Sequence, residues 1–251
     1  MKHLQVLKCK QLRLVFFLMA FCIAATASGQ EDHKVYDCIA VAKMDNTIFR
    51  GELAEKYTYT IKGTAYAYSD EFGKGNIIFN GKLYLGVFMN LNSHRDELQL
   101  KASESGISAT TTSTAAAADD GINIALKKNL VGDFSIGERN FTTLCGENAV
   151  KGLKEGYYEV LYKRGNNMLV KRHYKNVSEK TDAISGKMET IFKSKHKYYL
   201  VADGSVKTIQ SEKNLIKICR DKKSDAKEYL RKNKGKDSEE LMKGVMLIIE
   251  K

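Results

Sequence analysis

Short apolar runs that alternate with Gly-, Asn- and Asp-containing turns constrain the fold of this chain more than any other feature. Asn80-Gly81 stands between residues 76–79 and 82–89, two runs rich in β-branched and aromatic side chains. An Asn-Gly pair between two such runs is the strongest short-range signal for a β-hairpin. The 251 residues include no proline, so Gly, Asn, Asp and Ser must form the turns. We therefore expect an antiparallel sheet built from hairpins.

Comparable patterns predict strands along most of the chain. In the first half, residues 66–75 and 90–96 are expected as a loop and a turn, and strands are expected at 38–42, 47–49, 57–61, 97–100, 122–126, 133–136 and 141–145. The second half predicts two Tyr-rich hairpins. One pairs 157–162 with 168–174, and the other pairs 187–192 with 197–201 around a turn at 193–196, before a further turn at Asp203-Gly204.

From Ser211 onward the apolar period changes from two residues to about 3.6, which is typical of amphipathic helices. Ser211, then Asp221 or Ser224, and finally Asp237 with Glu240 provide successive capping signals. The fold class predicted is α+β: a mostly antiparallel sheet followed by two or three C-terminal helices packed on it. The apolar positions of these helices are Leu215, Ile218 and Cys219, then Ala226, Tyr229 and Leu230, then Leu241, Val245, Ile248 and Ile249.

Residues 1–27 have the layout of a signal peptide, with basic residues before an apolar run and small residues after it. The apolar run of about 12 residues would rise only about 18 Å as a helix, which is short for a bilayer core of about 30 Å. Ala25 and Ala27 predict cleavage after Ala27, and Gly29 is the alternative site. We expect an exported protein that is periplasmic, outer-membrane-associated or secreted, with no transmembrane helix in the mature chain.

Charge divides the remaining chain into two segments. Residues 28–150 carry 12 Lys and Arg against 16 Asp and Glu, whereas residues 151–251 carry 25 against 14. The first segment is expected to be β-rich with a flexible low-complexity loop at 102–121, and the second to hold the basic hairpins and the helices, as one domain or two. The asymmetry indicates that the basic segment faces an anionic partner or docks onto the acidic one.

No pattern in the sequence predicts a catalytic centre. The chain lacks G-x-S-x-G, H-E-x-x-H and C-x-x-C, and its histidines are isolated. Cys38, Cys145 and Cys219 remain after the leader; they allow one disulfide and a thiol or three thiols, and they are too far apart in sequence for a metal knuckle. We predict no cofactor, no metal site and no catalytic residue, the alternative being a hydrolase in which His94, Asp96 and Glu97 meet distant groups.

Two stretches are candidates for binding. Residues 90–97 gather amide, imidazole, guanidinium and carboxylate groups in one turn, although such residues often only bond their own backbone. The basic hairpins interleave Lys and Arg with Tyr, although lysine on strand edges is also a guard against aggregation. The predicted binding residues are Asn90, His94, Arg95, Asp96, Lys163, Arg164, Lys171, Arg172, Tyr174, Lys195, Lys197 and Tyr199.

Residues 79–98, 155–162 and 197–200, together with the Lys- and Asp-rich terminal helices, resemble in the same order a group of exported proteins from Bacteroidetes-type bacteria. No activity, cofactor or site is attached to that group. The resemblance therefore implies a cell-envelope location and adds no catalytic residue.

We predict a non-enzymatic envelope protein that binds or scaffolds another component. The alternative is a protein that binds a polysaccharide or a lipid head group through a basic Tyr and Lys face. The expected partner is another envelope protein, an anionic surface polymer or a lipid, and nucleic acid is not expected because the chain is predicted to be exported.

Overall fold

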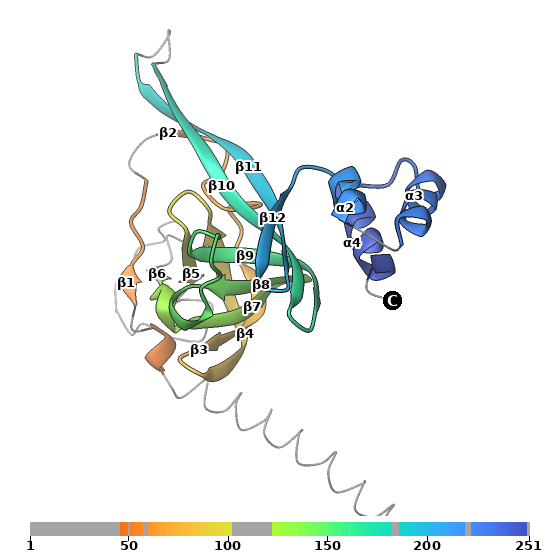
Figure 1. Cartoon of the computed structure of the whole chain (residues 1–251). Coiled ribbons are helices and arrows are strands. Elements are labelled where there is room, and N and C mark those ends of the chain that lie inside the picture. The colour runs from red at the N-terminus through yellow and green to blue at the C-terminus, as the bar shows by residue number, and fades with distance from the viewer. Residues whose placement is uncertain are drawn as a thin grey trace, which may run out of the picture. The chain divides into compact units, whose positions relative to one another are not determined.

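The computed structural model describes residues 46–49, 51–57, 60–101, 122–181, 186–218 and 222–249. These residues form one 12-stranded sheet followed by three α-helices (Figure 1). The predicted α+β class is confirmed. The predicted leader, the segment 38–42 and the low-complexity stretch 102–121 lie outside the described residues.

Neighbouring strands of the sheet pair in the order β1-β6-β5-β4-β3-β7-β8-β9-β10-β11-β12, and β2 pairs with β11 off this path. Every pairing is antiparallel except that of β2 with β11. The strands are β1 (Glu52–Leu53), β2 (Thr60–Lys62), β3 (Gly73–Phe79), β4 (Lys82–Asn92), β5 (Glu97–Lys101), β6 (Asn123–Ala125), β7 (Val131–Ile136), β8 (Arg139–Leu144), β9 (Gly156–Arg164), β10 (Asn167–Thr181), β11 (Met188–Ala202) and β12 (Ser205–Ile209).

The predicted Asn-Gly and Asp-Gly turns form two tight hairpins. Asn80 and Gly81 have φ values of 50° and 74°, and Asp203 and Gly204 have values of 50° and 70°. Two successive residues with positive φ are the requirement of a type I′ turn, which matches the twist of the flanking strands. The hairpins β3–β4 and β11–β12 follow from this local chemistry.

The predicted turn at residues 193–196 is wrong, because β11 runs without interruption from Met188 to Ala202. The second predicted hairpin is one strand, which pairs with β10 along the register from Met168 opposite Val201 to Thr181 opposite Met188. Residues 193–197 are exposed on both faces of this ribbon. A strand exposed to solvent on both faces can be polar throughout, so it lacks the apolar alternation that identifies a strand. Its sequence then resembles that of a turn.

Two smaller expectations also fail. Residues 47–49 belong to a 3₁₀ turn (Asn46–Phe49), because a three-residue apolar run does not distinguish a strand from one helical turn. The turn expected at 90–96 begins only at Ser93, since β4 continues to Asn92. Asn90 stays in the strand because its buried amide nitrogen donates to the carbonyl oxygens of Ser69 (2.8 Å) and Glu71 (3.0 Å).

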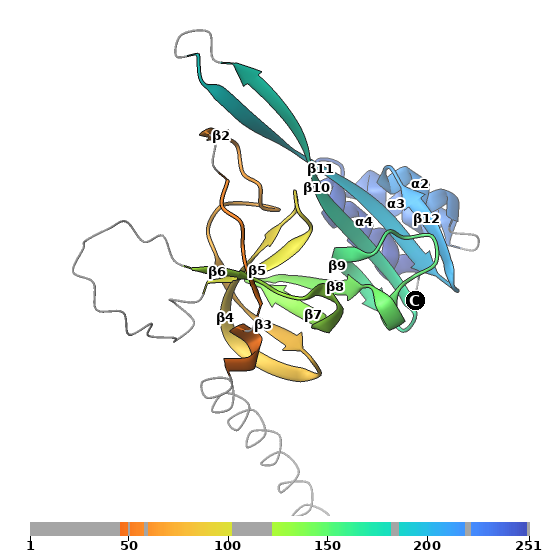
Figure 2. The same ribbon diagram turned by 90° about the vertical axis from the view of Figure 1, so that its left-hand side faces the viewer.

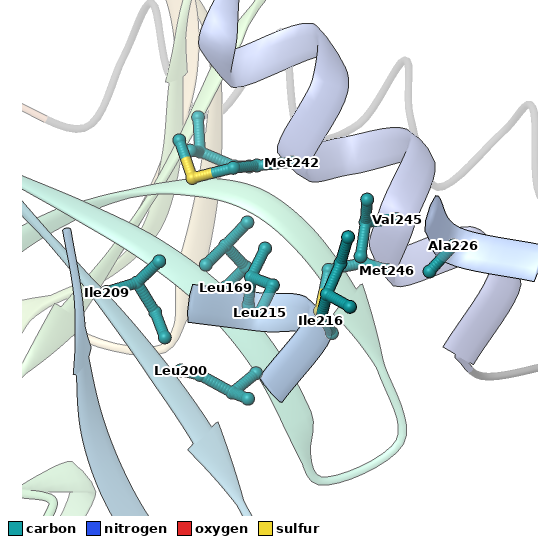
Figure 3. Packing of buried hydrophobic residues seen from close by; sticks show 10 residues of the cluster. Leu169, Leu200, Ile209, Leu215, Ile216, Ala226, Met242, Val245 and Met246 are labelled. Atoms are coloured by element: carbon teal, nitrogen blue, oxygen red, sulfur yellow. The ribbon is translucent and has the colours of Figure 1, made fainter. Parts of the chain in front are cut away.

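Three helices end the chain: α2 (Glu212–Ile218), α3 (Lys223–Lys232) and α4 (Ser238–Ile249). Their apolar sides pack on one face of β9–β12 and bury a core there (Figure 3). No helix among the described residues has the length and apolarity needed to span a bilayer. The buried residues of this core are Leu161, Leu169, Leu200, Ile209, Leu215, Ile216, Ala226, Met242, Val245 and Met246.

The opposite face of the same strands carries a smaller apolar cluster. Leu144, Tyr158 and Val170 are buried there, and Val160 and Tyr199 pack against them half-buried. Successive residues of β10 therefore serve two different cores, Leu169 under the helices and Val170 on the other side. This alternation fixes which face of the sheet each side chain of β10 occupies further along the strand.

We predict that Leu215→Ala destabilises the protein by about 2–5 kcal/mol, because it leaves a cavity in the helix–sheet core. Leu247→Ala on α4 is the matched control: Leu247 is 55% exposed, and its loss should change stability by less than about 0.5 kcal/mol. Urea unfolding monitored by circular dichroism measures both. Equal effects would show that the helices do not pack on the sheet as described.

Candidate functional site

The β10–β11 ribbon gathers five of the predicted binding residues on one face. Arg172 lies opposite Lys197, Tyr174 opposite Lys195, and Val170 opposite Tyr199 in the antiparallel register. Directly opposed residues share a face of the sheet. Lys193, a cation of the predicted basic hairpins that is not among the predicted binding residues, joins them opposite Asn176. We call Tyr174, Lys193, Lys195 and Lys197 the basic face.

The lysines of the basic face are exposed and evenly spaced. Lys193, Lys195 and Lys197 are alternate residues of β11, so their α-carbons follow one another at about 6.7 Å. The Nζ atom of Lys197 lies 5.8 Å from the ring centroid of Tyr174, which is half-buried. Tyr199 lies deeper, edge-on to Tyr158 at 6.2 Å. The arrangement is a row of cations beside a tyrosine ring.

Arg172 lies on the same face, but its guanidinium group binds other parts of the same chain. Its Nη1 atom donates to the carbonyl oxygen of Lys154 (2.7 Å) and to the Tyr158 hydroxyl (2.9 Å). Its Nη2 atom donates to the carbonyl oxygen of Glu155 (3.1 Å) and approaches Asp96 Oδ2 at 3.3 Å. With five donors in a fixed fork, arginine suits such a multiple anchor. Arg172 therefore positions the strand more than it offers a charge to a ligand.

Asp96 connects the β4–β5 turn to the second half of the chain. Its carboxylate binds Lys128 Nζ at 2.6 Å and Arg172 Nη2 at 3.3 Å, and it accepts from the Tyr157 amide at 3.4 Å. Gly156 leaves room for this contact, since a β-carbon there would lie 2.5 Å from Asp96 Oδ2 and 2.7 Å from Arg172 Nη2. Asp96 itself has a φ of 57°, and aspartate tolerates this conformation better than most residues.

Lys171 points to the opposite face and belongs to a buried polar cluster. Its Nζ atom binds Glu239 Oε1 at 2.6 Å, at the start of α4, and lies 3.7 Å from Glu159 Oε2. The Tyr198 hydroxyl, directly across on β11, donates to the same Glu239 oxygen at 2.8 Å. The predicted binding residue Lys171 therefore ties the first turn of α4 to the sheet.

Glu159 of β9 is the centre of this cluster, which we call the Glu159 cluster. Its Oε2 atom accepts hydrogen bonds from the Tyr68 hydroxyl (2.5 Å) and from His173 Nε2 (2.7 Å). Arg139 Nε lies 3.7 Å from Oε1. The Glu159, Lys171 and His173 side chains are only 7–8% exposed. A buried carboxylate needs such partners, because an unpaired charge is costly there.

Burial and hydrogen bonding set the protonation states of Glu159 and His173. Burial alone would raise the pKa of Glu159, but the hydrogen bonds from His173 and Tyr68 outweigh it and hold that pKa below its ordinary value. Burial lowers the pKa of His173, although Glu159 opposes this. At neutral pH the carboxylate is charged and the imidazole neutral. Because a carboxylate only accepts, His173 carries its proton on Nε2.

The most buried groups of the Glu159 cluster do not line the neighbouring cavity. A cavity of about 230 Å³ lies beside it, lined by Tyr68, Arg139, Asn90 and their neighbours, but Glu159, Lys171 and His173 do not line it. Glu159, Lys171 and His173 are therefore engaged with one another, whereas Tyr68 both donates to Glu159 and lines the cavity. This is the pattern of a structural network, in which every polar atom has a partner.

The remaining predicted residues do not join the basic face. His94 Nδ1 lies 2.9 Å from the Tyr57 hydroxyl, and its ring meets Phe192 edge-on at 5.0 Å. Arg95 binds Glu55 at 2.7 Å and covers the Tyr57 ring. Lys163, next to Arg164 in β9, lies 3.6 Å from Asp133 and opposite Met168 at the start of β10. Lys195 lies opposite Tyr174, which is six residues of β10, or about 20 Å, further along the strand.

Sequence reasoning missed Tyr68, Glu159, Glu239 and Tyr198. The one signal available was the alternation Lys171, His173 and Lys175 on β10, which places three titratable side chains on a single face. All three prove to be buried. Their partners come from elements far apart in the chain, and local pattern carries no information on such pairs.

Comparison with protein-family models, with curated proteins and with solved structures finds no match to this chain. The arguments on function therefore depend on the geometry described above.

The lowered pKa of His173 predicts that the protein loses stability in mild acid. Between the lowered pKa of the folded state and about 6.5 in the unfolded chain, only the unfolded chain binds the proton, so stability falls as the pH decreases through this window. His173→Gln removes this term while its amide can still donate to Glu159. The variant should lose a slope of up to about 1.4 kcal/mol per pH unit.

Urea midpoints measured from pH 7 to pH 5 test this. Part of the slope should persist in the variant, because burial also lowers the pKa of His94. A variant whose midpoints run parallel to those of the wild type would show that His173 does not stay neutral in the fold.

Proposed function

We propose that the protein is an exported, non-catalytic binding protein of the cell envelope whose basic face binds an anionic polysaccharide. Export is supported by the signal-peptide layout of residues 1–27. The observation that carries the binding proposal is the register of β10 with β11, which places Lys193, Lys195 and Lys197 in one exposed row beside Tyr174.

The spacing of the lysines favours a polymer over a single small anion. Three cations at intervals of about 6.7 Å on one strand present a row of charge, which is complementary to a chain with repeated carboxylate or sulfate groups. The ring of Tyr174 adds an apolar surface with a polar tip, on which a sugar ring can lie. Lysine rows of this kind contribute modestly per contact and gain strength by repetition.

The basic face suits a soluble polymer better than a bilayer surface. Proteins that bind lipid surfaces combine cations with apolar side chains that insert below the head groups. The two large apolar residues exposed on this ribbon, Val177 and Met188, lie on the opposite face from Lys193, Lys195 and Lys197. Among the described residues of the ribbon, the cationic side therefore has no exposed large aliphatic side chain to insert.

The absence of catalysis is proposed from the state of the titratable groups. Glu159, His173 and Lys171 bind one another out of contact with open space, and Asp96 is held by Lys128 and Arg172. Catalytic groups need a face open to substrate. These groups instead hold in place the strands that carry the basic face.

The triple variant Lys193→Gln, Lys195→Gln and Lys197→Gln tests the proposal with immobilised heparin as the polyanion. Losing three charge contacts should weaken binding by about tenfold or more at low ionic strength, since exposed pairs contribute about 0.5–1 kcal/mol each. Retention of the wild type should fall as salt is added. Retention and dissociation constants at several salt concentrations are the measurements.

The matched control is Lys213→Gln, Lys227→Gln and Lys243→Gln, which removes the same charge from exposed positions of the three helices. It should bind heparin like the wild type. Equal weakening of both variants would show that only net charge matters, and no retention of the wild type even at low salt would remove the proposal.

A further inference from the structure

One edge of β10 is open over its distal half. Its pairing with β9 ends where Lys171 meets Glu159, whereas its pairing with β11 continues to Thr181. In the described part of the chain, β10 has no other strand neighbour. Residues 173–181 therefore lack a strand partner on this edge over nine residues, on a ribbon that extends away from β3–β9 (Figure 2). Residues 176–181 are exposed there, whereas His173 and Lys175 are buried. An exposed strand edge is a template for pairing with another strand.

The sequence of this edge is complementary to itself. An antiparallel pair of identical strands related by a two-fold axis places one residue opposite its own copy, and full overlap of residues 173–181 puts Val177 at that centre. In this register Lys175, whose Nζ atom donates to Ser194 Oγ at 2.7 Å in the single chain, lies opposite Glu179 of the second copy, and Glu179 lies opposite Lys175. Tyr174 meets Lys180, and Asn176 meets Ser178. Opposite charges and a cation beside an aromatic ring stabilise cross-strand pairs.

The other symmetric registers do not pair residues of opposite charge in this way. Moving the centre by two residues to Lys175 or to Glu179 places like charges directly opposite each other and shortens the overlap. Steps of one residue shift the centre to Asn176 or Ser178, and both separate Lys175 from Glu179. The register of greatest overlap is thus also the register of best charge complementarity. Like charges directly opposite in a sheet are destabilising.

We propose that two copies of this chain pair through the β10 edge, antiparallel and centred on Val177, to form a homodimer with a continuous sheet. Val177 is 42% exposed in the single chain, and pairing covers it with its own copy. The two-fold axis stands perpendicular to the sheet, so the basic faces of both copies lie on the same side. The dimer therefore doubles the row of lysines without depending on what that row binds.

A disulfide at the centre tests the register. Directly opposed residues of an antiparallel pair have Cα atoms about 4.5–5.5 Å apart, which is within disulfide range. Val177→Cys should therefore give a covalent dimer on mild oxidation, seen by non-reducing electrophoresis. Met188→Cys, equally exposed on the same face but across the ribbon on β11, should not, and the wild type gives the background from the native cysteines.

Sedimentation equilibrium of the chain purified from expressing cells tests the dimer itself. The wild type should be dimeric in the micromolar range. Val177→Lys, which sets two lysines face to face, and Glu179→Lys, which sets each new lysine against Lys175, should be monomeric with unchanged circular dichroism. Met188→Lys is the control and should stay dimeric.

A monomeric wild type would overturn the proposal. The charged residues of β10 would then serve to prevent other strands from pairing with this edge. A dimer that survives Val177→Lys, or one in which Val177→Cys does not cross-link, would place the interface elsewhere. Heparin binding by a monomeric variant remains measurable, so this proposal and the proposed function can fail separately.

Discussion

The structure depends on how the buried carboxylate of Glu159 is neutralised. Tyr68 and His173 hydrogen-bond to it, and Lys171 approaches it while binding Glu239 of α4. Tyr68 lies in a loop, Lys171 and His173 in β10, and Glu239 in α4, so the requirement to satisfy one charge joins a loop of the first half, β9, β10 and the last helix. A buried pair of this kind adds little net stability over an apolar core, but breaking it is costly. Its role is to specify one arrangement of these elements.

This bracing determines where the protein can interact. Because residues alternate on a strand, fixing Lys171 and His173 inward turns Tyr174 and its neighbours on β11 outward. Arg172 adds a second brace on the outward side by binding Asp96, a residue of the acidic half. Some cations of the basic half thus bind carboxylates within the same chain. The lysines that stay exposed on β11 form the surface that we assign to binding.

Local chemistry made much of the fold predictable. Asn80-Gly81, Asp203-Gly204 and the change of period after Ser211 fixed two hairpins and the terminal helices, because turn type and helical spacing are properties of neighbouring residues. The polar stretch 193–196 was mistaken for a turn, since a ribbon wet on both faces carries no apolar alternation. The Glu159 cluster escaped prediction because its partners are distant: Tyr68 lies 91 residues from Glu159, and Glu239 lies 68 from Lys171.

The free energy of unfolding of Glu159→Gln at neutral pH tests the central claim most directly. The amide keeps the shape of the side chain but removes its charge, so Lys171 loses the opposite charge and the hydrogen bonds from Tyr68 and His173 go to a neutral amide oxygen. The account predicts a loss of about 3 kcal/mol relative to the wild type. A change smaller than about 0.5 kcal/mol would contradict it, since the fold would then not depend on this carboxylate.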